Sequence, residues 1–180
     1  MRAITVTYTI DELIDLCAGV TLSRIYDNTD HDRNNLLLDL YGITKDDMEV
    51  FEKHCLKFAC DYVYLAVKRH SWGRMPFRYS VMDNQQGHLV VIYNLMIGRV
   101  QERPAIEGME FNDIISDYMA RCIRDYALKE WYKLKGNLEW AQFHEAEFEV
   151  NKRQLLDFTQ GNNSDIGGMN IGKRNGYPFN

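Results

Sequence analysis

Hydrophobic residues recur every three or four positions along most of the chain, which is the spacing typical of amphipathic helices. The first such stretch predicts a helix over residues 10–26. Thr9 and Glu12 stand at its start with the spacing of a capping box, in which both side chains accept hydrogen bonds from free backbone N–H groups of the first turn.

A second stretch predicts one helix over 45–70. It begins at another pair with capping-box spacing, Thr44 and Asp47, and it ends in basic residues, as the helix dipole favours. Its expected inward side is given by the spacing of Met48, Phe51, Cys55, Phe58, Ala59, Tyr62, Val63 and Ala66.

Two further helices are predicted over 112–135 and 138–159. Gly136 ends the first and Asn137 caps the second, so the two helices are expected to form an antiparallel hairpin. The inward residues of the second helix are expected to be Trp140, Ala141, Phe148 and Leu155.

The segment between the first two helices is predicted to be less regular. Residues 27–35 are polar and turn-rich, which predicts a loop, and residues 36–41 predict one or two helical turns. Gly42 is expected to close this short element in a left-handed conformation.

Alternating residues predict the β-structure. Residues 3–8 are expected to form a short strand or an extended arm, and residues 77–97 a β-hairpin around a turn at 83–87. The second arm of the hairpin is apolar on both faces, so a short helix there stays open as an alternative.

The composition changes after Phe158. Residues 160–180 are rich in glycine and asparagine and show no periodicity, which predicts a flexible arm outside the core. The arm nevertheless carries apolar residues that a purely solvated tail would not need, and these are candidate partner-binding residues: Ile166, Met169, Ile171, Tyr177 and Phe179.

The predicted fold is therefore mainly α. A helical bundle of four main helices occupies residues 1–159, with an inserted β-hairpin near 77–97, and an extended C-terminal arm follows over 160–180. A chain of 180 residues has the size of one domain.

Net charge, cysteine context and the lengths of apolar runs argue against several classes of protein. A net charge of −5 argues against a dedicated nucleic-acid-binding protein, which normally shows a basic stripe. Four cysteines lie in apolar stretches without a C-x-x-C pair, which indicates free buried thiols in a reducing compartment. Residues 1–9 lack the apolar run of a signal peptide, and the longest apolar run, 89–97, is too short to span a membrane. A soluble, intracellular protein is expected.

Residues 167–174 nearly spell a phosphate-binding loop. That motif needs Ser or Thr after the lysine to hold magnesium, whereas this chain has Arg174 after Lys173. It also needs a preceding strand and a following helix, neither of which is predicted here. No nucleotide or other cofactor is therefore expected.

Two histidine-containing sequences could suggest a metal. They are Asp30-His31-Asp32 and His144-Glu145, and neither has the spacing that places two ligands on one helix face. Both are interpreted as solvated surface. No Gly-x-Ser-x-Gly sequence occurs, and no cysteine has an electropositive sequence context, so no catalytic or metal-binding residue is predicted and the chain is not expected to be an enzyme.

One aromatic residue of the helix over 112–135 is a candidate interface anchor. Tyr132 falls away from the main inward side of that helix, and tyrosine is enriched at interfaces. Burial in the core stays open as the alternative.

Several segments together resemble a known family. They are Thr44-Lys45-Asp46-Asp47 at the start of a long helix, the sequence DYALKEWY over 125–132, and a basic-aromatic end with Lys173, Arg174, Tyr177 and Phe179. The chain resembles the small neck proteins of tailed phages of gut Bacteroidetes, including crAss-like phages, which are similar to head–tail connectors (adaptors). The loop over 27–42 has no counterpart in this resemblance.

The resemblance implies a structural virion protein. Such a subunit forms a homo-oligomeric ring of about twelve copies between portal protein and tail, with head-to-tail contacts between subunits. DNA would pass through the ring lumen without specific binding, and the C-terminal arm, with Lys173 and Arg174, would bind a neighbouring component. The alternatives are a small helical protein-interaction module of the host cell, another phage tail or ring protein, and an enzyme with a site assembled from dispersed His, Asp and Glu residues.

Overall fold

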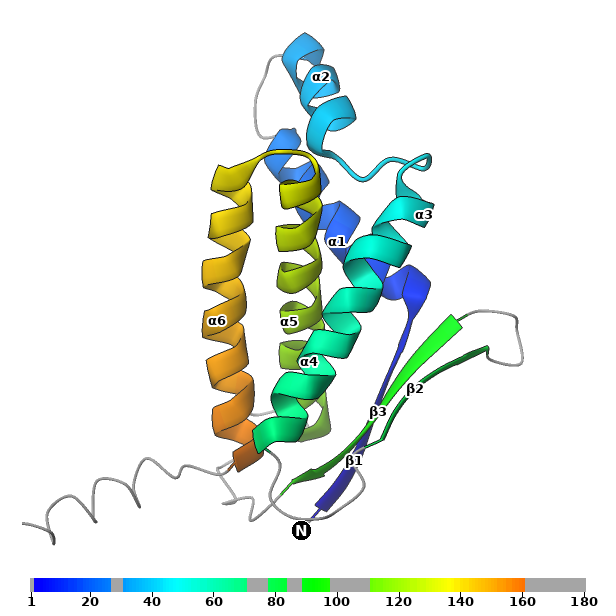
Figure 1. Ribbon diagram of the computed structural model, residues 1–180, viewed down its shortest axis with the longest axis vertical. Helices are drawn as coiled ribbons and strands as arrows, with labels where there is room; N and C mark the ends of the chain where they lie inside the picture. Colours follow the sequence, from blue (N-terminus) through cyan, green and yellow to red (C-terminus); the bar gives the residue numbers. More distant parts are fainter. Residues whose placement is uncertain (1, 27–30, 71–77, 84–88, 98–110, 161–180) are drawn as a thin grey trace, which may run out of the picture.

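The computed structural model describes residues 2–26, 31–70, 78–83, 89–97 and 111–160. The protein is mainly helical, as predicted, and a small sheet lies beside the helices (Figure 1). The elements in chain order are β1 (Arg2–Thr9), α1 (Ile10–Ile25), α2 (His31–Tyr41), α3 (Met48–Phe51), the π-helical turn η1 (Glu52–Leu56), α4 (Lys57–His70), β2 (Arg78–Asp83), β3 (Leu89–Ile97), α5 (Phe111–Leu134) and α6 (Leu138–Gln160).

Helices α5 and α6 form the predicted antiparallel hairpin (Figure 1). Gly136 has a φ of 77°, which only glycine adopts at little cost, and the N–H of Asn137 returns to the carbonyl of Tyr132 at 2.8 Å. The Asn137 side chain accepts from the N–H of Trp140 at 3.1 Å. The chain thus reverses within the three residues between α5 and α6, and α5 packs against α1, α4 and α6.

The capping box at the start of α1 is confirmed. Thr9 Oγ1 accepts from the N–H of Glu12 at 3.1 Å, and the Thr9 N–H donates to Glu12 Oε2 at 2.9 Å. These two bonds satisfy backbone donors that the first turn leaves without helical partners. The helix then places Leu13, Cys17 and Ile25 in the core.

Within the described residues, the sheet has three strands in the order β1-β3-β2, both pairs antiparallel. The arm or strand predicted over 3–8 is therefore a strand beside β3, and the alternative of a short helix at 89–97 is wrong. Residues 84–88, which link β2 to β3, lie outside the described residues. Val6, Tyr8 and Val91 are buried against the helices, and the Tyr8 hydroxyl donates to the Ser116 carbonyl of α5.

The loop predicted over 27–35 is wrong for its second half, because α2 already begins at His31. Tertiary contacts stabilise this polar helix. Its last residue, Tyr41, packs its ring on Trp140 with centroids 5.8 Å apart, and its carbonyl accepts from Trp131 Nε1 at 2.9 Å. The polar residues of this segment reflect its exposure to solvent and do not indicate a loop conformation.

Gly42 ends α2 for a different reason from the one predicted. Gly136 is the described glycine with a positive φ, so the left-handed conformation expected at Gly42 is wrong. A Cβ atom at Gly42 would lie 2.7 Å from the backbone oxygen of Leu38 and 2.6 Å from its Cδ1. The position requires glycine because the chain approaches the preceding turn too closely for a side chain.

The helix predicted over 45–70 begins three residues later, at Met48, and contains one π-helical turn. Residues 45–47 form a turn in which the Asp47 carboxylate accepts from the N–H and the hydroxyl of Thr44, at 3.3 and 2.8 Å. After α3, the N–H of Lys57 donates to the carbonyl of Glu52, five residues back, in the π-helical turn η1. Such turns insert one residue into an α-helix.

The π-helical turn moves the inward side of α4 by one residue. A continuous α-helix would place Phe51, Cys55, Phe58 and Tyr62 on one side. The structure instead buries Phe51, Cys55, Leu56, Ala59, Cys60, Val63 and Val67. Phe58 and Tyr62, predicted to face inward, consequently lie at the surface.

Candidate functional site

Of the eight residues predicted to bind a partner, Tyr132 is the one that the structure describes. It is fully buried, so its interpretation as an exposed anchor is wrong. Its ring packs edge-on against Trp140, at 5.0 Å between centroids, and parallel to His144, at 5.5 Å. Helix α5 is contacted by other elements on several sides. A residue outside its main apolar side, such as Tyr132, is therefore still covered. The remaining seven lie outside the described residues: Ile166, Met169, Ile171, Lys173, Arg174, Tyr177 and Phe179.

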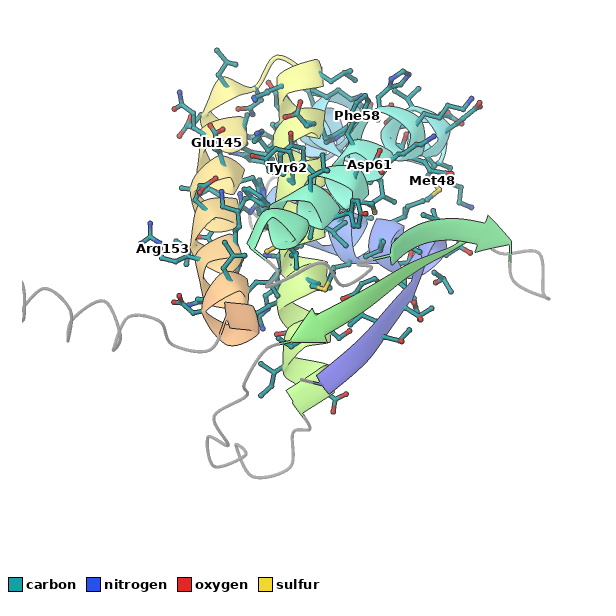
Figure 2. All side chains as sticks on the ribbon, turned by 60° about the horizontal axis from the view of Figure 1, so that its bottom comes forward. Met48, Phe58, Asp61, Tyr62, Glu145 and Arg153 are labelled. Carbon is teal, nitrogen blue, oxygen red and sulfur yellow. The ribbon has the colours of Figure 1, made fainter. Side chains whose placement is uncertain are left out.

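A row of exposed apolar residues on α4 is the strongest candidate site. Phe58, Tyr62 and Leu65 are 60%, 40% and 47% exposed. Their spacing of four and three residues places them on one face of the helix, with Asp61 among them (Figure 2). We call Phe58, Asp61, Tyr62 and Leu65 the α4 stripe. Large apolar residues exposed together on a rigid helix are typical of a protein-interaction surface.

Aromatic packing fixes one edge of the α4 stripe. The Tyr62 ring stacks on Tyr126 of α5, with centroids 4.4 Å apart and planes 18° from parallel, and meets Phe148 of α6 edge-on at 5.6 Å. These contacts hold Tyr62 in one orientation between α4 and α6 (Figure 2). An immobilised aromatic loses little further entropy when it binds a partner, which favours affinity.

Charged residues border these aromatic rings. Lys129 Nζ lies 4.3 Å from the Tyr126 ring centroid and 3.4 Å from one carboxylate oxygen of each of Glu130 and Glu145. Lys152 Nζ lies 5.0 Å from the Phe148 centroid. An apolar centre inside a polar border is the usual arrangement of a protein–protein interface.

The sequence contains a signal for this surface that the periodicity analysis did not use. Apolar residues occur as adjacent pairs at 55–56, 59–60 and 62–63, so two helical phases compete over the same stretch. The π-helical turn η1 lies at the first pair, and both residues of the pairs 55–56 and 59–60 are buried, whereas at 62–63 Val63 is buried and Tyr62 is exposed. Such turns are frequent at functional sites.

A second constellation is buried between α5 and α6. The Asp125 carboxylate accepts from Arg124 Nε at 2.8 Å and from Asn151 Nδ2 at 2.7 Å, and His144 Nδ1 lies 3.4 Å from Asp125 Oδ1. Asp125 and His144 have almost no exposed area, so the interpretation of His144 as solvated surface is wrong. We call Asp125, Arg124, His144 and Asn151 the Asp125 cluster.

Burial and hydrogen bonds oppose each other in the Asp125 cluster. Burial alone would raise the pKa of the Asp125 carboxyl, but hydrogen bonds from His144 and Arg124 outweigh it and hold that pKa below its usual value. Burial lowers the pKa of His144, although the contact with Asp125 acts in the opposite direction. The stable state is therefore an ionised carboxylate beside a neutral imidazole whose Nδ1 carries the proton.

The chemistry open to the Asp125 cluster is limited by its burial. An Asp–His pair can act as a general base or as a general acid, and both roles need contact with a substrate. Neither side chain reaches the surface of the described residues. Cys17 of α1 is also fully buried, and burial raises its thiol pKa, which disfavours the reactive thiolate. As built, the cluster joins α5 to α6 through charge-assisted hydrogen bonds.

No group of three or more His, Cys, Asp or Glu side chains among the described residues is arranged to hold a metal ion. None of the helices described is both long and apolar enough to cross a bilayer.

Comparison of the chain with protein-family models, with curated protein sequences and with solved structures finds no match.

Proposed function

We propose that this chain is a structural subunit of a phage neck, a head–tail connector that joins the portal protein to the tail. The observation that carries the proposal is the α4 stripe, where a folded helical protein keeps Phe58, Tyr62 and Leu65 at its surface. Large apolar side chains that are exposed together are typical of a surface that binds another protein. The resemblance of residues 44–47 and 125–132 to phage neck proteins supplies the identity of that partner.

A ring requires two different contact patches on each subunit, because its subunits associate head to tail. The α4 stripe supplies one. Helix α2 supplies a second, since Leu36 and Leu40 are 59% and 46% exposed. Helix α2 stands at one end of the molecule, whereas α4, which carries the stripe, runs from near the middle toward the opposite end (Figure 1). Two separated apolar patches suit a head-to-tail ring better than a two-fold dimer, which needs a single self-complementary patch.

The finer features of the proposal follow the resemblance. The subunit would be a bundle of four main helices with its β-hairpin inserted, assembled in about twelve copies around the DNA path. The virion would be its site of action. The C-terminal segment would add binding energy toward the portal or tail through its apolar residues and through Lys173 and Arg174.

The test is assembly in the presence of the neighbouring phage proteins. The chain is co-expressed with candidate portal and tail proteins from its own genome, and the purified complex is examined by mass measurement and electron microscopy. A ring-sized complex is expected, and Phe58→Asp is expected to abolish it because a charge would be buried in the contact. A chain that stays monomeric with portal and tail proteins present contradicts the proposal. A matched control, Val150→Asp on the exposed face of α6, should leave assembly intact.

The genome gives an independent test. Genes for portal, capsid and terminase beside this one would support the connector, whereas a neighbourhood of host genes would favour the alternative, a helical interaction module of the host cell.

A further inference from the structure

We infer that residues 161–180 of the chain dock on the α4 stripe of the same chain. Three observations support this occupant: where α6 ends, how long the remaining segment is, and which residues it carries. The inference stands apart from the proposed function, because it concerns the isolated protein.

The first observation is the place where the described chain ends. Helices α4 and α6 contact each other, and their C-terminal ends lie at the same end of the molecule (Figure 1). The segment that follows Gln160 therefore starts beside the helix that carries the α4 stripe, and on the side where Tyr62 packs against α6.

The second observation is length. Twenty residues follow Gln160, and an extended chain of that length reaches about 66 Å. The α4 stripe is much closer, since Phe58 lies about 18 Å along the helix from His70. A segment tethered this near its binding site has an effective concentration on the order of millimolar, so even a weak intrinsic affinity keeps it bound.

The third observation is composition. The segment carries five large apolar residues separated by glycine and asparagine, and the α4 stripe offers three exposed apolar side chains. Lys173 and Arg174 stand between the apolar residues, while Asp61 lies within the stripe and exposed Glu145 lies across from it on α6 (Figure 2). Opposite charges at the border of an apolar contact favour the correct register.

Docking in the same chain has a consequence for association. While its own segment covers the α4 stripe, Phe58 and Leu65 are not available to a second molecule. A partner that binds the stripe must first displace the segment, so its apparent affinity falls by the fraction of chains that are uncovered.

The segment contains its own protease reporter, because trypsin cleaves after Lys173 and Arg174. In the full chain, cleavage there is expected to be about tenfold slower than in the double variant Phe58→Ser/Leu65→Ser, since cleavage follows the population of the undocked form. The matched control is Leu138→Ser/Val150→Ser on α6, whose residues are exposed to a similar extent, and it should cleave at the native rate. Equal rates in all three proteins would overturn the inference.

A second experiment, paramagnetic NMR with a spin label, needs no substitution in α4 and therefore tests the docking even if the double variant fails to fold. A spin label on Asn175→Cys should broaden the methyl NMR signals of Leu65 and leave those of Leu36 unchanged. The four native cysteines are buried, so the label attaches to the introduced thiol. Broadening at Leu65 that survives dilution with unlabelled protein supports docking in the same chain. Absence of broadening at Leu65 overturns the inference. Broadening that occurs only when isotope-labelled molecules are mixed with separately spin-labelled ones also overturns it, because that contact joins two different chains.

Discussion

Asn151 donates a hydrogen bond of 2.7 Å to Asp125, across the interface of α5 and α6 where both side chains are buried. The same carboxylate binds Arg124, which is itself only partly exposed. The two helices of the hairpin are therefore joined by a polar contact in addition to their apolar packing. A buried charge with several donors is stable only while all of them remain in place.

Replacing Asp125 by Ala should lower the free energy of unfolding by about 3 kcal/mol, because it leaves a partly buried guanidinium and a buried amide without their acceptor. Urea denaturation followed by tryptophan fluorescence measures the loss. The matched control is Asp117→Ala, which removes an exposed ion pair with Arg121 on the same helix and should cost less than about 1 kcal/mol. Similar costs for the two variants would show that the Asp125 cluster does not stabilise the hairpin.

The pKa of His144 predicts how stability depends on pH. Burial lowers that pKa below its ordinary value of 6.5, so the unfolded chain binds the proton more readily than the folded one. Stability from neutral His144 is fully present above pH 6.5 and is lost as the pH falls below it. The loss is at most about 1.4 kcal/mol per pH unit for one proton.

The measurement is the free energy of unfolding between about pH 7.5 and pH 5. In His144→Phe, which retains a ring beside Tyr132, the slope over this range should be flatter than in the native chain. The carboxyl of Asp125 does not interfere, because its pKa lies below its ordinary value of 3.8 and its contribution is lost only at lower pH. An unchanged slope in His144→Phe would mean that this histidine is not the titrating group.

The parts of the fold that local chemistry determines could be predicted from the sequence. The capping box of Thr9 and Glu12 and the reversal at Gly136 and Asn137 each depend on residues within one or two turns of each other. Local signals of this kind do not need the rest of the molecule, which is why the structure reproduces them.

The parts that failed depend on contacts between distant residues. Tyr132 is buried because α5 is contacted on several sides, and the polar helix α2 is held to the rest of the fold where Tyr41 contacts Trp131 and Trp140. The exposure of Phe58 follows from a π-helical turn that no residue type requires. The Asp125 cluster joins residues 19 and 26 positions apart, a relation that helical periodicity does not describe.

The two glycines Gly42 and Gly19 should respond oppositely to alanine. At Gly42 the added Cβ would lie 2.7 Å from the Leu38 backbone oxygen, so the chain must shift and stability should fall by about 1–3 kcal/mol. At Gly19, inside α1, nothing lies within 4 Å of the added Cβ, and stability should rise by about 0.5–1 kcal/mol because alanine favours helix. Thermal unfolding of both variants measures the difference. Destabilisation of Gly19→Ala would indicate that this face of α1 is covered.

The buried hydroxyls of Tyr132 and Tyr8 differ in their hydrogen bonding, so their removal should have opposite effects on stability. Among the described residues the Tyr132 hydroxyl is buried without a hydrogen-bond partner, whereas the Tyr8 hydroxyl donates to the Ser116 carbonyl. Tyr132→Phe removes a desolvated polar group, so the free energy of unfolding should stay the same or rise by up to about 1 kcal/mol. Tyr8→Phe should lower it by about 1 kcal/mol, because a satisfied bond between the sheet and α5 is lost. Urea denaturation of both variants decides the point, and equal destabilisation would mean that the Tyr132 hydroxyl has an acceptor in solution.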